Sequence, residues 1–362
     1  MTRTVDKPLL YITLVLFWGG ILILASASMV ISHKNLGSAF YYTLRQLIYG
    51  GLVGTLAFIT SQYIPYRYWR KLAVPLIIVS FLLLALLFVP ELGYTSGGAR
   101  RWIQIGNLSF QPAEILKLAF IIYLASWIDT RRKEVSSVSY GVMPFSIMLV
   151  IIGIFLIMQP DIGTLFIVAV TSGIVYFIGG GRVSQIATLF IFGLVIAYFL
   201  IQLAPYRLAR ILVFLDPTLD PQGVGYQINQ AFIAIGSGGL WGRGFGMGLQ
   251  KYSYLPEPMG DSIFAIFAEE MGFVGVIILV TLFGLFFWRG LTIARNAPDI
   301  FGKLLASGIS ISIMGQAFIN MAAISGFLPL TGIPLPLVSY GSTSLVVTLM
   351  SVGILLNISK YS

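Results

Sequence analysis

The sequence has 362 residues, of which 57% are apolar and 10% are charged, and its formal net charge is +9. So little charge cannot cover the surface of a water-soluble domain of this size, and the composition therefore predicts a polytopic membrane protein. The chain has no cysteine and a single histidine, which excludes disulfides, thiol chemistry and a zinc site. Its basic residues are scattered between apolar runs, a pattern that indicates membrane topology and argues against a nucleic-acid partner.

Apolar segments long enough to cross a bilayer, about 20 residues each, recur along the whole chain. They predict an all-α bundle of about ten membrane helices forming one domain over residues 1–362. The expected spans are residues 9–30, 44–63, 72–89, 113–128, 142–158, 162–180, 185–203, 262–288, 304–325 and 336–358. The end of the first segment resembles a signal-peptide cleavage site, but its length favours an uncleaved first helix.

The distribution of Lys and Arg between the loops predicts the orientation. With both termini cytoplasmic, thirteen basic residues lie on the cytoplasmic side and seven outside, as expected for a membrane protein. The two long loops, about residues 91–112 and 204–261, then face outward, the second of them between the seventh and eighth helices. The remaining two basic residues, Arg45 and Lys117, fall within spans.

The shorter outer loop combines positive charge with an aromatic side chain. It reads GYTSGGARRWIQIGNLSFQPAEILK, in which Arg100 and Arg101 precede Trp102. Guanidinium groups match phosphate oxygens and an indole face stacks on a sugar, so these residues are candidates for a sugar-phosphate clamp. The alternative is an interfacial tryptophan with arginines on lipid headgroups.

The longer outer loop has two parts. Apolar residues at helical spacing over residues 208–215, beside Arg207 and Arg210, predict an amphipathic helix on the outer leaflet. The stretch GVGYQINQAFIAIGSGGLWGRGFGMG follows, and its glycines allow either an anion-binding turn or a flexible surface loop. Neither nucleotide-binding glycine fingerprint is present, which argues against a nucleotide fold.

Charged residues inside the apolar segments are expensive and therefore informative. Lys117 lies three residues after Glu114, on the same helix face, and Asp161 follows in the turn QPDIGT. We expect one of these carboxylates to contact Lys117. Such a pair could equally serve function or fix helix register.

Four acids cluster in YLPEPMGDSIFAIFAEE, where Asp261 stands at the mouth of an apolar run. Glu269 lies about 12 Å further along a helix, so it cannot share a small site with Asp261. Glu269 and Glu270 indicate a polar cavity or bonds to neighbouring helices. Asp261 is either a functional acid or a helix N-cap, and Glu257 lies nearby between two prolines.

The last outer feature, FLPLTGIPLPLVSYGSTS, contains three prolines that interrupt helix. Broken backbone in a membrane needs protein or water around it, so this segment is expected to line a cavity. Its hydroxyls, including that of Ser339, would face that cavity.

Taken together, these motifs resemble the SEDS family (shape, elongation, division and sporulation), membrane glycosyltransferases of bacterial wall synthesis. The resemblance covers about residues 7–358 and rests on GGARRWI, FQPAEILK, QPDIGT, GYQINQAFIAIGSGGLWGRGFG, QKYSYLPE, DSIFAIFAEEMGFVG and PLTGIPLPLVSYG. The glycine loop running into QKYSYLPE is more similar to the cell-division branch, FtsW, than to the elongation branch, RodA. The chain departs from the family where Pro258, Met259 and Gly260 replace the usual His and Thr, and where SYGSTS replaces SYGGSS.

The resemblance implies that Asp261 is the catalytic acid and that Trp102, Lys117 and Asp161 match functional positions. We assign to the substrate site the following residues: Arg100, Arg101, Trp102, Gln111, Lys117, Asp161, Arg243, Lys251, Glu257 and Ser339. The implied substrate is lipid II, a disaccharide-pentapeptide on undecaprenyl pyrophosphate. Asp261 would accept the proton of the acceptor 4-hydroxyl. Arg100 and Arg101, joined by Lys251 or Arg243, would stabilise the leaving pyrophosphate, and a divalent cation such as Mg²⁺ could assist them.

The resemblance also implies a setting, namely the bacterial cytoplasmic membrane with the active site on its outer side. The implied partners are a class B penicillin-binding transpeptidase, other membrane proteins of the division complex, and membrane lipids. Two rivals stay open. One is a lipid II flippase or transporter with a path through Lys117, Asp161, Glu269 and Glu270, and the other is a non-catalytic scaffold of the division complex.

Overall fold

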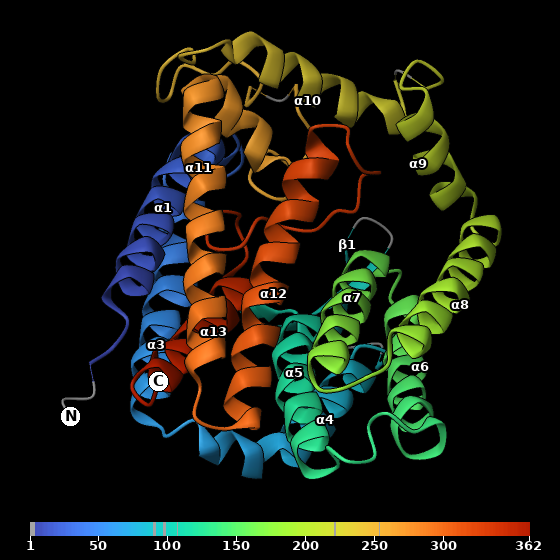
Figure 1. The fold of residues 1–362 in the computed structure, drawn as a ribbon. Coiled ribbons are helices and arrows are strands. Elements are labelled where there is room, and N and C mark those ends of the chain that lie inside the picture. The colour runs from blue at the N-terminus through green and yellow to red at the C-terminus, as the bar shows by residue number, and fades with distance from the viewer. Residues whose placement is uncertain (1–3, 90–91, 97–98, 107, 221, 253) are drawn as a thin grey trace.

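The computed structural model describes residues 4–89, 92–96, 99–106, 108–220, 222–252 and 254–362, and it consists mainly of helices (Figure 1). The first half contains α1 (Lys7–Leu36), α2 (Tyr41–Arg45), the π-helical η1 (Gln46–Leu52), α3 (Val53–Tyr63), α4 (Arg67–Leu86), β1 (Gly93–Ser96), β2 (Ala99–Ile105), β3 (Leu108–Phe110), α5 (Pro112–Thr130), the π-helical η2 (Val138–Val142), α6 (Met143–Met158) and α7 (Ile162–Ile178). The second half contains α8 (Val183–Gln202), α9 (Pro205–Leu215), α10 (Val224–Gly238), α11 (Ile263–Asn296), α12 (Ile300–Ile324) and α13 (Ser342–Ser359).

Each of the ten segments predicted to span a membrane lies largely on a helix or a run of helices, which confirms the prediction of an all-α polytopic membrane protein. Over the described residues, seven helices are long and apolar enough to cross a bilayer: α1, α4, α6 together with η2, α8, α11, α12 and α13. The other three segments are the run from α2 to α3 with its π-helical turn, α5 with its charged residues, and the 17-residue α7.

The two ends of the bundle differ in what they carry. Figure 1 places both termini at one end, and α9 and α10 lie across the opposite end. α9 confirms the helix predicted over residues 208–215, whereas α10 forms where a turn or flexible loop was expected. We call the two ends the terminal end and the loop end.

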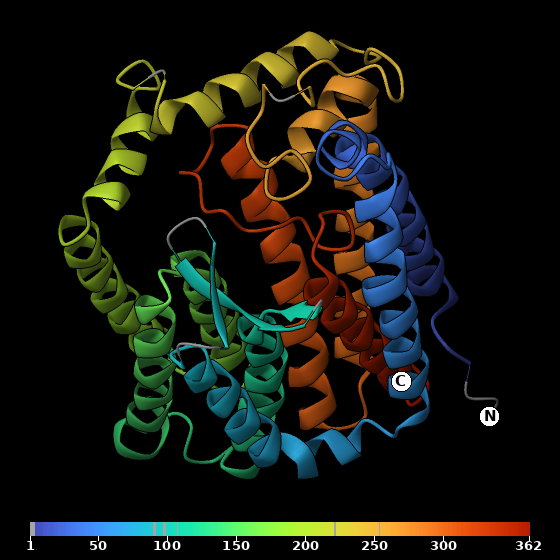
Figure 2. The same ribbon diagram turned by 180° about the vertical axis from the view of Figure 1, so that it is seen from behind.

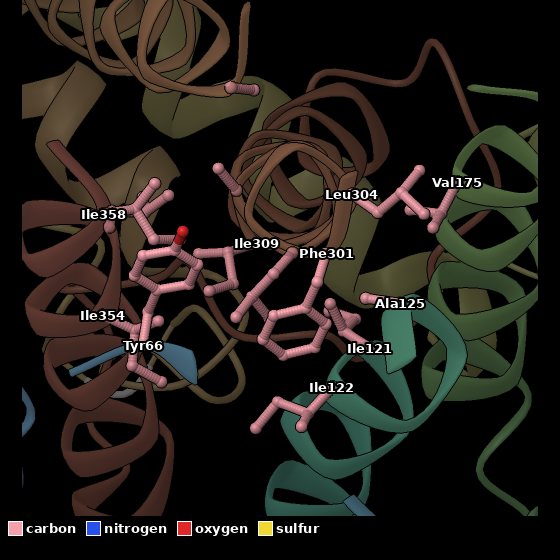
Figure 3. Close-up of a cluster of buried hydrophobic side chains, with 14 of the residues drawn as sticks. Tyr66, Ile121, Ile122, Ala125, Val175, Phe301, Leu304, Ile309, Ile354 and Ile358 are labelled. Carbon is pink, nitrogen blue, oxygen red and sulfur yellow. The ribbon is translucent and has the colours of Figure 1, made fainter. Parts of the chain in front are cut away.

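Apolar packing dominates the terminal end. Figure 3 shows Tyr66 and Phe301 among isoleucines from α5, α12 and α13, and the two rings stack with their centroids 6.3 Å apart. α12 is the interior helix of the bundle, since it packs against α11, α5, α7 and α13 and most of its residues are buried. A second apolar cluster joins α1, α11 and α13 closer to the loop end.

The shorter outer loop contains a three-stranded antiparallel sheet that the sequence analysis did not predict. Its strand order is β1-β2-β3, with Tyr94 opposite Trp102 and Ile103 opposite Phe110. Figure 2 shows the sheet running across the middle of the molecule toward the start of α13. This agrees with a hydrogen bond from the Gln111 amide to Thr343 Oγ1 of 3.2 Å.

The expected span over residues 262–288 lies on α11, which is a candidate membrane span, but the helix is not continuous because it is broken at Gly272. That glycine has φ 66° and ψ −169°, which lie outside the helical region. The loop after α10 fills the break: the amides of Phe273 and Val274 donate to the carbonyls of Gly239 and Leu240 at 2.9 and 3.1 Å. The long second part of α11 is therefore the spanning helix, and the short first part carries Asp261 at its start.

The expected span over residues 336–358 is also too long, because α13 begins only at Ser342. Residues 329–341 form no helix, and they contain the three prolines. Proline lacks the amide hydrogen that a helix requires, which explains the late start. We call residues 331–341 the proline segment.

Candidate active site

Asp261 lies in a tight turn directly before α11. The amides of Gly260 and Ser262 both donate to the carbonyl of Glu257, at 3.0 and 3.3 Å, and so close the turn. Glu257 has a positive φ of 47°, and its side chain is exposed. The turn therefore holds two carboxylates near each other, one exposed and one half-buried.

Three successive carbonyls fix the position of this turn. The carbonyl of Met259 accepts from the amide of Tyr340 at 2.8 Å, and that of Gly260 accepts from Ser339 Oγ at 2.7 Å. The carbonyl of Asp261 accepts from Asn320 Nδ2 of α12 at 2.8 Å. Ser339, assigned to the substrate site from the sequence, thus supports the turn, because its hydroxyl also accepts from the amide of Leu335 at 2.8 Å.

The Asp261 carboxylate is held by α10 and has an unusual proton affinity. Gln227 Nε2 donates to both carboxylate oxygens at 3.3 Å and to Ser262 Oγ at 2.9 Å. Burial, and next the negative charge of Glu257, raise the pKa of Asp261 from 3.8 to about 6, against the opposing effects of Gln227 and Arg210. A carboxylate with this pKa is a stronger base than an ordinary aspartate and is still ionised at neutral pH.

Arg210 provides positive charge near Asp261, and Arg101 from a separate segment acts electrostatically on Arg210. Burial lowers the pKa of Arg210, in α9, while Asp261 raises it and Arg101 lowers it. Arg210 Nη1 donates to the carbonyl of Leu330 at 3.1 Å, and Arg101 donates to the carbonyls of Gln159 and Pro160. Arg210 also lines a cavity of about 250 Å³ whose other walls are apolar residues of α9, of α10, of the loop between them and of residues 326–330.

The buried charges of α5 and α7 form two further groups. Lys117 Nζ lies 2.8 Å from Glu114 Oε1 and donates to Gln316 Oε1 at 2.5 Å. The expected contact between Lys117 and a carboxylate is therefore confirmed, and the partner is Glu114. Asp161 caps α7 through the amide of Thr164 and accepts from Gln111 Nε2 at 3.4 Å.

Lys251 and Arg243 do not join Asp261. Lys251 is 1% exposed and donates to Glu270 at 2.7 Å, to Ser26 Oγ at 2.9 Å and to the carbonyl of Gly246 at 2.7 Å. These three bonds use all three hydrogens of the ammonium, so Lys251 cannot also stabilise a leaving group. Arg243, on the same glycine-rich loop as Lys251, has its Nε 3.7 Å from Oε1 of Glu269 in α11.

The glycine-rich loop does bind an anion, but the anion belongs to the chain itself. The amides of Leu249 and Gln250 donate to the two oxygens of Glu269 at 2.8 and 3.1 Å. The acids proposed for a transport path, Asp161, Glu269 and Glu270, thus lie in separate hydrogen-bonded groups. Lys117 belongs to a further group.

The remaining predicted residues lie on β2. Arg100 is exposed and donates to Thr95 Oγ1 at 3.3 Å, while Trp102 is half-buried. Among the described residues, no three or more Asp, Glu, His or Cys side chains gather closely enough to hold a metal ion.

Sequence reasoning missed four polar residues that shape the site: Gln227, Arg210, Gln316 and Asn320. Arg210 was counted only as a charge on an amphipathic helix. Gln316 and Asn320 are the two amides of the mainly apolar α12, and that rarity was the available signal, whereas Gln227 is one of three amides in α10 and does not stand out.

These observations define the class of protein: a polytopic membrane protein with a basic carboxylate held at the loop end of its bundle. A family model described as cell cycle protein, covering FtsW, RodA and SpoVE, matches residues 7–362. Stage V sporulation protein E of Bacillus subtilis is 40% identical over 99% of this chain and 97% of its own length. The probable peptidoglycan glycosyltransferase FtsW of Trichlorobacter lovleyi is 40% identical over 98% of this chain and 93% of its own.

Solved structures agree with these relatives. A chain of a peptidoglycan synthase complex that coordinates polymerization and crosslinking has a TM-score of 0.80 at 29% identity, with 99% of both chains covered. The crystal structure of the rod shape determining protein RodA of Thermus thermophilus has a TM-score of 0.72 at 28% identity, with 98% of this chain and 96% of RodA covered. The chain belongs to the FtsW/RodA/SpoVE family, which is the SEDS family.

Proposed function

We propose that this protein is a peptidoglycan glycosyltransferase that polymerises lipid II on the outer face of the bacterial cytoplasmic membrane. The observation that carries the proposal is the half-buried Asp261 carboxylate, held by Gln227 and carrying a pKa of about 6. Relatives that match nearly the whole chain are probable peptidoglycan glycosyltransferases, which supports the same reaction here. The thirteen-to-seven excess of basic residues that the sequence predicts on the cytoplasmic side supports an outward-facing loop end.

In the proposed reaction, the 4-hydroxyl of the acceptor sugar attacks the anomeric carbon of the donor. Its proton passes to Asp261, the new glycosidic bond forms, and the bond to the lipid pyrophosphate breaks. With a pKa of about 6, roughly nine in ten Asp261 side chains are ionised at pH 7 and ready to accept that proton. Pyrophosphate leaves as an anion, so it requires charge stabilisation and no general acid.

Arg101 and Arg210 are the arginines that we assign to this charge stabilisation. The Arg210 guanidinium acts electrostatically on Asp261 and lies beside an apolar cavity, and Arg101 acts on Arg210. Arg100 lies on the same strand as Arg101, exposed, and is a candidate for the acceptor or donor headgroup. Guanidinium groups suit phosphate oxygens because they donate two parallel hydrogen bonds.

The direct test compares two isosteric substitutions on the same end of the molecule. Asp261→Asn should abolish polymerisation of lipid II in liposomes, whereas Asp216→Asn, an exposed carboxylate beside α9, should leave it unchanged. Glycan chains of normal length and yield from Asp261→Asn would remove Asp261 from the mechanism. Transfer of labelled lipid II across the bilayer without polymer would favour the flippase.

Asp261→Asn should also fold. Because the native pKa of Asp261 is raised above 3.8, the folded state binds a proton more tightly than the unfolded state. Ionisation of Asp261 therefore lowers stability as the pH rises from about 4 through 6, and the Asn variant avoids this loss. At pH 7, we expect the thermal midpoint of Asp261→Asn in detergent to equal or exceed that of the wild type. At pH 4, the thermal midpoint of the variant should not exceed that of the wild type.

Within the family, we propose the division branch, with septal wall synthesis as the role and RodA-like elongation as the alternative. SpoVE and FtsW relatives are both 40% identical, so the proposal rests on the glycine loop and its QKYSYLPE continuation. A class B penicillin-binding transpeptidase is the proposed partner, supported by the peptidoglycan synthase complex among the similar structures. A fluorescent fusion should gather at the septum, and a uniform signal along the side wall would favour elongation.

A further inference from the structure

Two amide side chains of α12 connect the turn of Asp261 to the proline segment. Gln316 and Asn320 lie one helical turn apart, so both project from the same face of α12. Both are buried, Asn320 with 1% of its surface exposed. Such a pair of amides in the interior helix of a membrane bundle requires hydrogen-bond partners on the facing segments.

Asn320 bridges two carbonyls that belong to different parts of the chain. Its Nδ2 donates to the carbonyl of Asp261 at 2.8 Å and to that of Ile333 at 2.7 Å. Its Oδ1 is buried and has no hydrogen-bond partner among the described residues. The cost of burying that acceptor is similar in size to the gain from two neutral hydrogen bonds, so Asn320 contributes geometry more than stability.

Gln316 extends the bridge by one residue along the proline segment. Its Nε2 donates to the carbonyl of Pro334 at 2.9 Å, next to the carbonyl held by Asn320. Its Oε1 accepts from Lys117, whose charge is balanced by Glu114. The carbonyls of Ile333 and Pro334, which lie outside any helix or sheet, are thus both hydrogen-bonded to side chains of α12.

These hydrogen bonds can fix the position of the Asp261 turn, but they cannot relay protons to it. Amide side chains do not titrate near neutral pH, and the connection from Lys117 to Asp261 passes through backbone carbonyls. Ser339 and Tyr340 of the proline segment hold the preceding two carbonyls of the same turn. The Asp261 main chain is consequently located between α12 and the proline segment.

We propose that Asn320 and Gln316 are positioning residues for Asp261, which lock its turn against α12 and thereby fix the place and the hydration of its carboxylate. This inference rests on the proposed function of Asp261 and adds how that side chain is held. A base displaced by about 1 Å loses on the order of 100-fold in rate, so the lock matters for turnover. Neither amide is proposed to touch the substrate.

The chain offers a matched control in Asn357 of α13. Asn357 is also buried, at 2% exposure, and also bridges two backbone groups, the amide of Tyr66 and the carbonyl of Gln62, at 2.8 and 2.7 Å. It lies at the terminal end, in the same half as the cluster of Figure 3. Asn320→Leu and Asn357→Leu therefore remove comparable bonds near to and far from Asp261.

The experiment measures lipid II polymerisation by both variants in liposomes, with thermal unfolding in detergent. Asn320→Leu should lower kcat by about 100-fold with KM changed by less than about threefold. Measured as a function of pH, the activity of Asn320→Leu should be lost at a lower pH than that of the wild type. The reason is that releasing the turn exposes the Asp261 carboxylate to water, which favours its ionised form. Asn357→Leu should lower the thermal midpoint at least as much as Asn320→Leu, because both polar atoms of Asn357 are hydrogen-bonded, while kcat per folded molecule and the pH profile stay at wild-type values.

A second variant, Gln316→Glu, tests the inference independently in case Asn320→Leu does not fold. Gln316→Glu keeps an acceptor for Lys117 but loses the donor to Pro334, and it should lower kcat in the same way to a smaller extent. Equal kcat and pH profiles for Asn320→Leu and Asn357→Leu would overturn the inference, as would full activity of Gln316→Glu. If Asp261→Asn, assayed in parallel, stays active, the proposed function fails instead.

Discussion

The terminal end and the loop end of this molecule are held together by different means. At the terminal end, regular helices bury aromatic and branched side chains, as in the cluster around Tyr66 and Phe301. At the loop end, α11 breaks at Gly272, the proline segment has no regular structure, and side-chain amides and ion pairs hold the pieces. Stability and chemistry are thereby separated, since irregular backbone places Asp261 and regular packing supports the bundle.

The largest expected effect breaks the buried ion pair of the loop end. Lys251→Met would leave the Glu270 carboxylate buried without its cation, at a cost of about 3–5 kcal/mol in the free energy of unfolding. The double variant Lys251→Met/Glu270→Leu should recover most of this loss, because no buried charge remains. Denaturant unfolding in detergent measures both. A single variant as stable as the wild type would show that the pair does not hold the glycine loop.

The next effect concerns the break in α11. Gly272→Ala would force an alanine to φ 66° and place its Cβ 2.2 Å from the Gly242 amide nitrogen. The dihedral strain alone costs about 1–3 kcal/mol, and the clash adds to it. Gly284→Ala, with open space around its Cβ in the same helix, should be neutral or stabilising by up to about 1 kcal/mol. Equal thermal midpoints would contradict the backbone described for Gly272.

A smaller change tests the terminal end. Phe301→Leu removes the ring that stacks on Tyr66 and should lower the free energy of unfolding by about 1–2 kcal/mol. Because this cluster does not touch the turn of Asp261, polymerisation per folded molecule should stay at the wild-type rate. A changed pH profile in this variant would mean that the two ends are coupled.

The smallest effect is electrostatic and confined to the site. Glu257→Gln removes the negative charge that helps raise the pKa of Asp261, so that pKa should fall toward its ordinary value. The acid limb of kcat/KM would then move to lower pH, with stability almost unchanged because Glu257 is exposed. The control is Glu134→Gln, which changes an exposed acid at the terminal end and should leave the pH dependence of kcat/KM unchanged.

The regular part of the fold could be predicted from the sequence because bilayer thickness imposes a length and an apolar composition on each span. Even the contact of Lys117 with a carboxylate followed from helix spacing and the cost of a lone buried charge. The small sheet, α10 and the break at Gly272 were missed, since glycine-rich stretches adopt conformations that tertiary contacts select.

The site was predictable only in part, for a related reason. Asp261 stands out as a charge at the start of an apolar run, but its supports come from α9, α10, α12 and the proline segment. Lys251 was assigned to the substrate because a count of charges cannot reveal that Glu270 binds it. Long-range partners of this kind are set by packing and leave no local pattern.

The central claim, that Asp261 is the base, is tested most directly by the pH dependence of lipid II polymerisation in liposomes by the wild type and Asp261→Asn. The wild type should keep full activity at pH 7 and lose it toward low pH through an apparent pKa near 6, because the base becomes protonated. Asp261→Asn should give only background at every pH. Wild-type activity that persists unchanged to pH 4.5, or chain synthesis by Asp261→Asn at the wild-type rate, would contradict the account.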